Sequence, residues 1–255
     1  MQEKIVIKPF LDVFNAQGKL TTQLIYGELV KLTGDENEFG VGIKSELDGY
    51  TGFCDDNYLI EAKQQTHKVK VINSPIFENS DLKSKHICNL SLNSFLYIKE
   101  KGEVFSNIGI GWIYNKHISE INEYYDFTNM MELATDFSST PYVWAGRTSY
   151  GIDCSAFAQM LFLACGIIMP RDTKDQCKLN WQEIKLTDLK TSDLIFWDGH
   201  VGIMLDNINI IHANASDMMV KQDLLKNVIE NIKNKENKDI KKILRYKPDR
   251  QIIIK

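Results

Sequence analysis

The chain has 255 residues, enough for two or three small domains, and its 44% hydrophobic and 25% charged residues are typical of a globular protein. Its 30 basic and 34 acidic residues give a net charge of −4, which argues against a nucleic acid or an anionic membrane as a partner. The N-terminus lacks the apolar core of a signal peptide and the longest apolar run is about half a bilayer span, so we expect a soluble, cytoplasmic protein.

The first 120 residues are expected to form β structure. Strand-forming residues fill 23–32, a turn leads into a short strand at 48–54, and Lys101-Gly102 marks a hairpin within 93–105. Another short strand is expected at 108–114. Many short strands with glycine turns favour small barrels, and this length suits two barrels of roughly 60 residues better than one sandwich.

The pattern changes after residue 125. Helical spacing over 129–138, with Asn129 and Glu132 as a capping box, predicts a helix, and a second helix, apolar nearly all round and therefore buried, is expected over 155–165 before Gly166. Residues 193–214 predict three strands with turns near Asp198-Gly199 and Asp206-Asn207. The tail after 220 predicts a charged amphipathic helix, a solvated turn at 231–239 and a last strand at 240–246.

Cys154 stands where the buried helix is expected to begin. The partial positive charge and unpaired N–H groups of a helix N-terminus stabilise a thiolate, which predicts a lowered pKa and a nucleophilic sulfur. The same N–H groups are suited to a developing oxyanion. Asp153 is either a helix N-cap or a functional carboxylate. Cys165 and Cys177 are interpreted as structural, and the odd number of cysteines without a disulfide spacing indicates a reduced compartment.

A nucleophilic cysteine needs a base, and two of the five histidines lie in the same predicted domain. If a hairpin is centred on residue 206, His200 and His212 pair directly and their side chains share a face. We expect His200 to be the base and His212 to orient it. The remaining histidines lie in the β modules or the linker: His67, His86 and His117.

Each of these residues also has a plainer interpretation. A cysteine in an apolar run is usually a small core residue, and a lone strand histidine is usually structural. Zinc binding by Cys154, His200 and His212 is an alternative, but the chain has no CxxC or HxxxH pair, so no metal is expected. Tyr142 and Trp144 are by default aromatic core residues.

Four motifs in order, PYVWAGRTSYGIDCSAF (141–157), PRDTKDQ (170–176), DLIFWDGHVGIML (193–205) and IIHAN (210–214), resemble the NlpC family of bacterial cell-wall peptidases. Those are papain-like cysteine enzymes of permuted order. The resemblance covers about 126–255, and TQLIYGELV and DGYTGF resemble, more weakly, the SH3-like modules that accompany the family. It implies an α+β fold: an antiparallel sheet packed on helices at 126–255, preceded by SH3-like barrels at 1–66 and 67–125.

The resemblance also implies roles for single residues. Cys154 matches the nucleophile, His200 the base, His212 the third polar residue and Tyr142 a tyrosine near the oxyanion. Asp153 and Ser155 match positions that bind the free amine of an N-terminal L-Ala in muropeptide-recycling members, and Tyr50 is the candidate for a tyrosine that closes that pocket. Ala145-Gly146 and Ser155-Ala156 stand where the family often has Gly-Gly and Ser-Gly, which predicts tight packing without loss of activity.

The implied reaction is hydrolysis of the bond between γ-D-Glu and a diamino acid in peptidoglycan-derived peptides, without a cofactor. A peptidoglycan-binding module with an idle catalytic domain and an acyltransferase on the same scaffold are the alternatives. The sequence leaves open whether the diamino acid is diaminopimelate or lysine, whether the wall fragment is the cell's own, the route of any export and the oligomeric state.

Overall fold

The computed structural model describes residues 2–247 and divides into two compact units. Residues up to Tyr124 together with Arg147–Ser149 form the first unit, and Tyr125–Gly146 together with the residues from Tyr150 onward form the second. The division into three domains at 66 and 125 stays a prediction. No helix within residues 2–247 is long and apolar enough to cross a bilayer.

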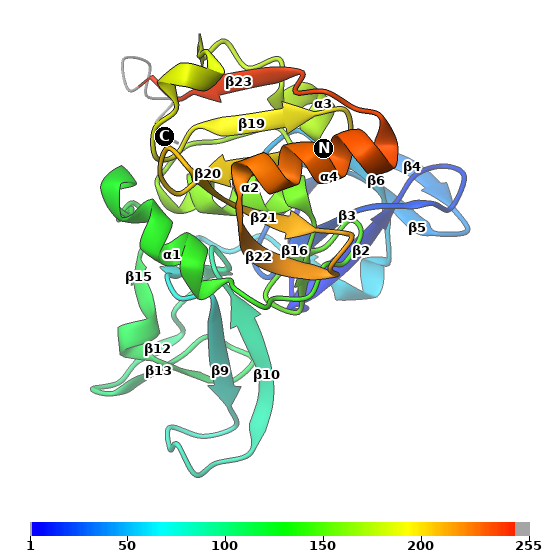
Figure 1. The fold of residues 1–255 in the computed structure, drawn as a ribbon. Coiled ribbons are helices and arrows are strands. Elements are labelled where there is room, and N and C mark those ends of the chain that lie inside the picture. Colours follow the sequence, from blue (N-terminus) through cyan, green and yellow to red (C-terminus); the bar gives the residue numbers. More distant parts are fainter. Residues whose placement is uncertain (1, 248–255) are drawn as a thin grey trace. The chain divides into compact units, whose positions relative to one another are not determined.

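The first unit consists of antiparallel strands in separate sheets (Figure 1). A seven-stranded sheet has the order β3-β2-β6-β5-β4-β1-β7, and its strands are β1 (Glu3–Val6), β2 (Phe10–Phe14), β3 (Leu20–Ile25), β4 (Leu29–Asn37), β5 (Gly40–Ser45), β6 (Thr51–Cys54) and β7 (Leu59–Glu61). The 3₁₀ helix η1 (Asp56–Tyr58) joins the last two. The alternate side chains of this sheet bury one apolar cluster that includes Val6, Val13, Leu24 and Ile43.

Two further sheets occupy the rest of the first unit. One has the order β10-β9-β14-β13-β12 and the other β11-β8-β15. Their strands are β8 (His67–Val69), β9 (Asn73–Phe77), β10 (His86–Ser91), β11 (Phe95–Leu96), β12 (Glu100–Lys101), β13 (Phe105–Asn107), β14 (Trp112–Tyr114) and β15 (Ile118–Glu120), with the 3₁₀ helix η2 (Asn115–His117). A second apolar cluster contains residues of both sheets, including Val69, Ile76, Leu90 and Ile113. The SH3-like assignment of these modules stays a prediction.

Glycine turns correct two strand predictions in this unit. The strand expected at 23–32 is two strands, because Gly27 at φ +76° reverses the chain between β3 and β4. The strand expected at 108–114 is shortened to β14, because Gly109 at φ +96° turns the chain first. The hairpin at Lys101-Gly102 is present as β12 and β13.

A buried ion pair also belongs to the first unit. Arg147, in β16 (Arg147–Thr148), donates from Nη1 to Glu28 Oε2 at 3.1 Å and to the Gln23 carbonyl at 2.8 Å. Glu28 accepts in addition from the Ser45 hydroxyl and the Ile25 amide, and both charged side chains are almost fully buried. The carboxylate therefore depends on the guanidinium for compensation of its charge.

The second unit is built on a six-stranded antiparallel sheet of order β18-β23-β19-β20-β21-β22. Its strands are β18 (Gln182–Glu183), β19 (Leu194–Trp197), β20 (His200–Met204), β21 (Asn209–Asn214), β22 (Met219–Leu224) and β23 (Lys242–Arg245), and β17 (Gly151–Ile152) lies outside it. The helices are η3 (Phe127–Asn129), α1 (Met130–Asp136), α2 (Cys154–Ala164), α3 (Thr173–Gln176), η4 (Leu186–Asp188) and α4 (Leu225–Glu236).

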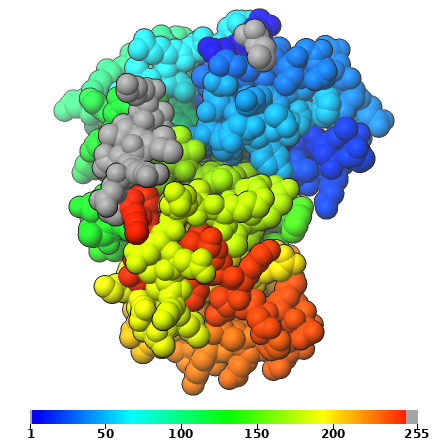
Figure 2. All heavy atoms as spheres, turned by 90° about the horizontal axis from the view of Figure 1, so that it is seen from above, coloured from blue at the N-terminus to red at the C-terminus, as the bar shows by residue number. Residues whose placement is uncertain are grey.

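Helices pack on this sheet and leave the ends of β20 and β21 to form the site. α4 contributes Leu225 and Val228 to an apolar cluster with Trp197, Met204 and Ile210 of the sheet, and α2 packs against β20 and β21 (Figure 1). Every residue of α2 is buried, as its apolar surface predicted, and Gly166 at φ +78° ends it. Charged side chains of α4 face solvent on the surface that Figure 2 shows in orange to red.

Three details of the second unit differ from expectation. Asn129 makes no capping hydrogen bond, and the N-cap that is formed belongs to Asp126, which accepts from the Thr128 amide of η3. Residues 219–224 are the strand β22, not the start of a helix. The solvated turn expected at 231–239 is largely the second half of α4, and the chain turns after Asn237 in the left-handed conformation.

Candidate active site

Cys154 is the first residue of α2. Asp153 is the N-cap of this helix, and its Oδ1 accepts a hydrogen bond from the Ala156 amide at 2.8 Å. The cap fixes the start of the helix, and with it the position of the sulfur. Ala145, nearby in the chain, is held at φ +66° and is almost fully buried, so the extra methyl is tightly packed as the sequence predicted.

The electrostatics at Cys154 contradict the predicted low pKa. Burial, reinforced by the Asp153 carboxylate, raises the pKa of the thiol to about 11. The Val201 amide, the Thr173 hydroxyl and Arg171 act in the opposite direction and are outweighed. At neutral pH the sulfur is therefore protonated.

The sulfur of Cys154 lies against the backbone on both sides of His200. Its S–H points to the Gly199 carbonyl oxygen, 4.0 Å from Sγ, and the Val201 amide donates toward the sulfur. The Thr173 hydroxyl of α3 is 3.9 Å away. Among residues 2–247 no hydrogen bond joins the sulfur to either imidazole.

His200 and His212 are brought together by the β20–β21 hairpin. His200 Nε2 is 2.8 Å from His212 Nδ1, and the two ring centroids are 5.0 Å apart. The predicted direct pairing is wrong by two residues, because Ile203 pairs with Ile211 and Met204 with Ile210. A shift of two residues preserves the face on which a side chain lies, so both imidazoles still point to the same side.

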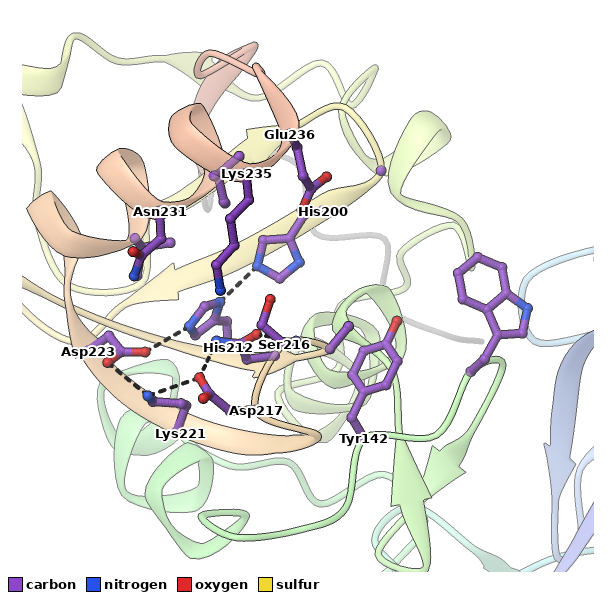
Figure 3. Close-up of a pocket in the computed structure, with 16 residues that line it drawn as sticks. Tyr142, His200, His212, Ser216, Asp217, Lys221, Asp223, Asn231, Lys235 and Glu236 are labelled. Atoms are coloured by element: carbon purple, nitrogen blue, oxygen red, sulfur yellow. Dashed lines mark hydrogen bonds and ion pairs between the residues drawn. The ribbon is translucent and has the colours of Figure 1, made fainter.

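Asp223 of β22 completes a hydrogen-bonded row. Lys221 pairs with His212 in the strand register, and Asp223 lies two residues further along the same face. Asp223 Oδ2 is 3.2 Å from His212 Nε2, and its Oδ1 is 3.2 Å from Lys221 Nζ. Figure 3 shows the row as dashed lines from His200 through His212 and Asp223 to Lys221.

Burial keeps both imidazoles neutral. It lowers the pKa of His200 to about 3, with smaller contributions from His212 and Lys238. Burial also lowers the pKa of His212, although the hydrogen bond and the charge of Asp223 oppose this. A neutral imidazole has one nitrogen without hydrogen, which is the property required of a general base.

Asp153 and Ser155 form a buried cluster with Arg171. Arg171 donates to both carboxylate oxygens of Asp153, at 3.0 and 2.6 Å, and to the Ser155 hydroxyl at 2.9 Å. The Ser155 hydroxyl in turn donates to Asp153 at 3.1 Å. The two residues predicted to bind an amine are thus adjacent, but the carboxylate already has a bidentate partner.

Tyr142 borders a pocket of about 430 Å³ that His200 and His212 also line (Figure 3). Its backbone is fixed by the edge of β22, because the Tyr142 amide donates to the Met218 carbonyl at 2.9 Å. Burial, with the charges of Cys154 and Asp153, raises the pKa of its hydroxyl, so that hydroxyl stays a hydrogen-bond donor. Trp144, at the same pocket, is 61% exposed, so it is not the core residue that its type suggests by default.

The other candidates lie elsewhere. Tyr50 belongs to the first unit, where its amide donates to Asp48, and its predicted role at the amine pocket stays a prediction. His67, His86 and His117 are bonded to local partners in the first unit. The five cysteines form no disulfide, and residues 2–247 hold no group of three His, Cys, Asp or Glu placed to bind a metal ion.

Three polar residues of the site had no role assigned from the sequence. Arg171 and Thr173 lie within the PRDTKDQ motif, so the motif located them without revealing their contacts. Asp223 carries no motif. The signal that could have found it is the alternation of MVKQDL, which places Asp223 on the face of Lys221, but only once residues 219–224 are recognised as a strand.

The fold is that of known NlpC/P60 proteins. A crystal structure of an NlpC/P60 family protein from Bacillus cereus ATCC 10987 superposes with a TM-score of 0.80 at 18% identity, covering 96% of this chain and 100% of that one. An NlpC/P60 endopeptidase from Photobacterium damselae subsp. piscicida superposes with a TM-score of 0.62 at 13% identity, covering 94% and 70%.

Sequence comparison agrees with the fold. Residues 139–237 match the NlpC/P60 family, so this chain carries an NlpC/P60 domain. It is 25% identical over 242 residues to the gamma-D-glutamyl-L-lysine dipeptidyl-peptidase of Bacillus subtilis strain 168, covering 84% of this chain and 81% of the relative. It is 24% identical over 220 residues to dipeptidyl-peptidase 6 of Lysinibacillus sphaericus, covering 77% and 80%.

Proposed function

We propose that the chain is a cysteine peptidase that hydrolyses the γ-D-glutamyl–diamino acid bond of peptidoglycan stem peptides. One observation carries the proposal: the sulfur of Cys154 lies against the backbone flanking His200, and His200 is hydrogen-bonded to His212. A thiol at a helix N-terminus beside an oriented imidazole is the arrangement that thiol acyl transfer requires.

Acylation starts from a neutral thiol and a neutral imidazole. The thiol proton passes to His200 as the sulfur attacks the γ-D-glutamyl carbonyl carbon, and the carbonyl oxygen becomes an oxyanion. The N–H groups at the start of α2 and the Tyr142 hydroxyl are the donors proposed for that oxyanion. The His200 imidazolium then gives its proton to the departing amine of the diamino acid, which leaves a thioester on Cys154.

Deacylation repeats these roles with water. His200 takes a proton from the water that attacks the thioester, and the thiol leaves protonated, so the dipeptide acid is released and the enzyme is restored. His212 accepts from His200 in both half-reactions and stabilises its positive charge. No step requires an added cofactor.

We further propose that the substrate is a short peptide with a free N-terminal L-Ala. The names of the two sequence relatives support this, since a dipeptidyl-peptidase releases dipeptides from an amino end. The Asp153–Arg171 pair has no net charge, so the ammonium would be held by hydrogen bonds to Asp153 and Ser155 and by partial charge, not by an isolated carboxylate. The predicted Tyr50 contact remains part of this proposal, and so do cytoplasmic recycling of wall fragments and the SH3-like identity of the N-terminal modules.

Purified protein incubated with L-Ala-γ-D-Glu-diaminopimelate and L-Ala-γ-D-Glu-L-Lys tests the reaction by chromatography of the products. We expect release of L-Ala-γ-D-Glu, abolished in Cys154→Ser while substrate binding persists. Binding without cleavage, unchanged in Cys154→Ala, would favour the alternative of a non-catalytic peptidoglycan-binding module. Transfer of the acyl group to an added amine in place of water would favour an acyltransferase.

A further inference from the structure

Asp223 contacts both His212 and Lys221, which extends the hydrogen-bonded row past the two histidines. We propose that Asp223 is a positioning residue that fixes the tautomers of His212 and His200, so that His200 presents Nδ1 as the base for Cys154. The role of Asp223 in catalysis rests on the peptidase function proposed above. The hydrogen-bond pattern itself can be measured without any substrate.

The first step is the tautomer of His212. An ionised carboxylate only accepts hydrogen bonds, so the 3.2 Å contact between Asp223 Oδ2 and His212 Nε2 places the hydrogen on Nε2. Because burial keeps His212 neutral, its Nδ1 then carries no hydrogen and can only accept.

The second step carries the same constraint to His200. Its Nε2 lies 2.8 Å from the accepting His212 Nδ1, so His200 must donate from Nε2. In the neutral ring this leaves Nδ1 of His200 without hydrogen, ready to take the thiol proton. With the opposite tautomer, His212 Nδ1–H would donate to His200 Nε2, so a neutral His200 would carry its hydrogen on Nδ1 and could not take the thiol proton there.

The strand geometry holds Asp223 for this task. Its two carboxylate oxygens have separate partners: Oδ2 faces His212, and Oδ1 faces Lys221 Nζ at 3.2 Å. Lys221 also pairs with Asp217 at 3.0 Å. The side chain of Asp223 is 24% exposed, against 3% for that of His212, so the row runs from a solvent-reached carboxylate to a buried ring.

The competing explanation is a purely structural role, in which Asp223 serves only the ion pair with Lys221. Asp217 provides the matched control. It pairs with the same lysine and its charge also raises the pKa of His212, but its side chain bonds to Lys221 and Asn214 and, within residues 2–247, to no histidine. Comparing Asp223→Ala with Asp217→Ala therefore separates the hydrogen bond to His212 from the loss of one carboxylate beside Lys221.

The test uses the full chain labelled with ¹⁵N-histidine and two-bond ¹H–¹⁵N correlation spectra, in which protonated and unprotonated ring nitrogens resonate apart. In the unaltered protein and in Asp217→Ala we expect both His200 and His212 as Nε2–H tautomers. In Asp223→Ala we expect a mixture for His212 and His200, with kcat on the tripeptide lowered about 10- to 100-fold at an unchanged KM, and partial recovery in Asp223→Glu.

Unchanged tautomers in Asp223→Ala, or an equal change in Asp217→Ala, would overturn the proposal. The spectra test the tautomers whether or not the chain cleaves peptides. A failure of the proposed peptidase function is recognised separately, because the unaltered protein would then release no product. Circular dichroism and the melting temperature confirm that each variant is folded before it is compared.

Discussion

At the scale of single residues, two opposing effects act on the pKa of the Cys154 thiol, and the one that raises it is larger. The helix N-terminus and the Val201 amide favour the thiolate, but burial and the adjacent Asp153 favour the thiol more strongly. The site at rest is consequently a neutral thiol near neutral imidazoles. A preformed thiolate–imidazolium pair is not its resting state.

Alkylation by iodoacetamide measures this state directly. Because the folded pKa of Cys154 is raised to about 11, we expect its alkylation rate in the free protein to keep rising with pH through pH 9 to 10. Rates are followed by mass spectrometry of the Cys154 peptide, with Cys154→Ser reporting the reaction of the other four cysteines. A rate that levels off below pH 7 would show a thiolate already formed at neutral pH.

The sequence predicted where the motif residues lie, but it did not predict which other residues contact them. The structure confirms that Asp153 is an N-cap, that Cys154 begins the buried helix, and that His200 and His212 lie together. The catalytic roles of Cys154, His200 and His212 stay a prediction. The Asp153–Arg171 pairing and the contact of Asp223 with His212 were missed. Both contacts join residues that come from different segments of the chain and that belong to no recognisable spacing pattern. The sequence alone therefore does not show that they meet.

At the scale of elements, the β20–β21 hairpin decides how the imidazoles meet. Asp206 Oδ1 accepts from the amides of Ile208 and Asn209, both at 2.7 Å, and the Leu205 amide donates to the Asn209 carbonyl. This side-chain turn encloses three residues, so the hairpin is centred on Asn207 and not on Asp206. The two-residue error in the predicted register comes from that turn.

Gly202 lies where this hairpin leaves little room for a side chain. A Cβ there would lie 2.5 Å from the side chain of Ile210 and 3.3 Å from the Cβ of His212. We expect Gly202→Ala to destabilise the fold by about 1–3 kcal/mol through overpacking and to lower kcat by displacing His212. Urea unfolding and tripeptide hydrolysis measure the two effects.

Ile208→Ala serves as the control for Gly202→Ala, because Ile208 is in the same hairpin but 56% exposed. Its stability and activity should stay close to those of the unaltered protein. A Gly202→Ala variant indistinguishable from Ile208→Ala in both measurements would show that the hairpin adjusts freely around His212.

The strand β22 was not predicted, and for that reason the contact of Asp223 with His212 was not predicted either. Its sequence MVKQDL mixes charges with few strand formers and leads directly into α4, so the sequence predicts a single amphipathic helix for the whole tail after 220. β22 is ordered by tertiary contacts instead: it pairs with β21 along its length and with residues 139–142 on its other edge.

At the scale of the whole molecule, the chain divides into two compact units, and the short segment Arg147–Ser149 belongs to the first although its neighbours in sequence belong to the second. The change from β structure to mixed structure near residue 125 was visible in the sequence. The membership of Arg147 was not, because it depends on a buried carboxylate, Glu28, more than a hundred residues earlier.

Arg147→Met tests that ion pair. Removing the guanidinium leaves the Glu28 carboxylate buried without its charge partner, so we expect a loss of about 3–5 kcal/mol in the free energy of unfolding of the first unit. Differential scanning calorimetry or urea unfolding measures it. The double variant Glu28→Gln/Arg147→Met should recover much of the loss, whereas equal stability of Arg147→Met and the unaltered protein would show that the pair contributes nothing.

The proposed substrate class is tested with peptides that differ only at their amino end. We expect acetylation of the N-terminal L-Ala to lower kcat/KM at least about tenfold, equivalent to about 1.4 kcal/mol of transition-state stabilisation. Parallel assays on the free and acetylated tripeptide give the ratio. Equal rates would remove the amine-binding role proposed for Asp153 and Ser155 and leave the peptidase chemistry untouched.

The most direct test is the identity of the residue that carries the acyl group during turnover. Acid-quenched reactions with L-Ala-γ-D-Glu-diaminopimelate, followed by peptide mapping, should show an L-Ala-γ-D-glutamyl thioester on Cys154 and on no other cysteine, and none in Cys154→Ser. Turnover at an undiminished rate in that variant, or an acyl group on a different residue, would contradict the assignment of Cys154 as the nucleophile.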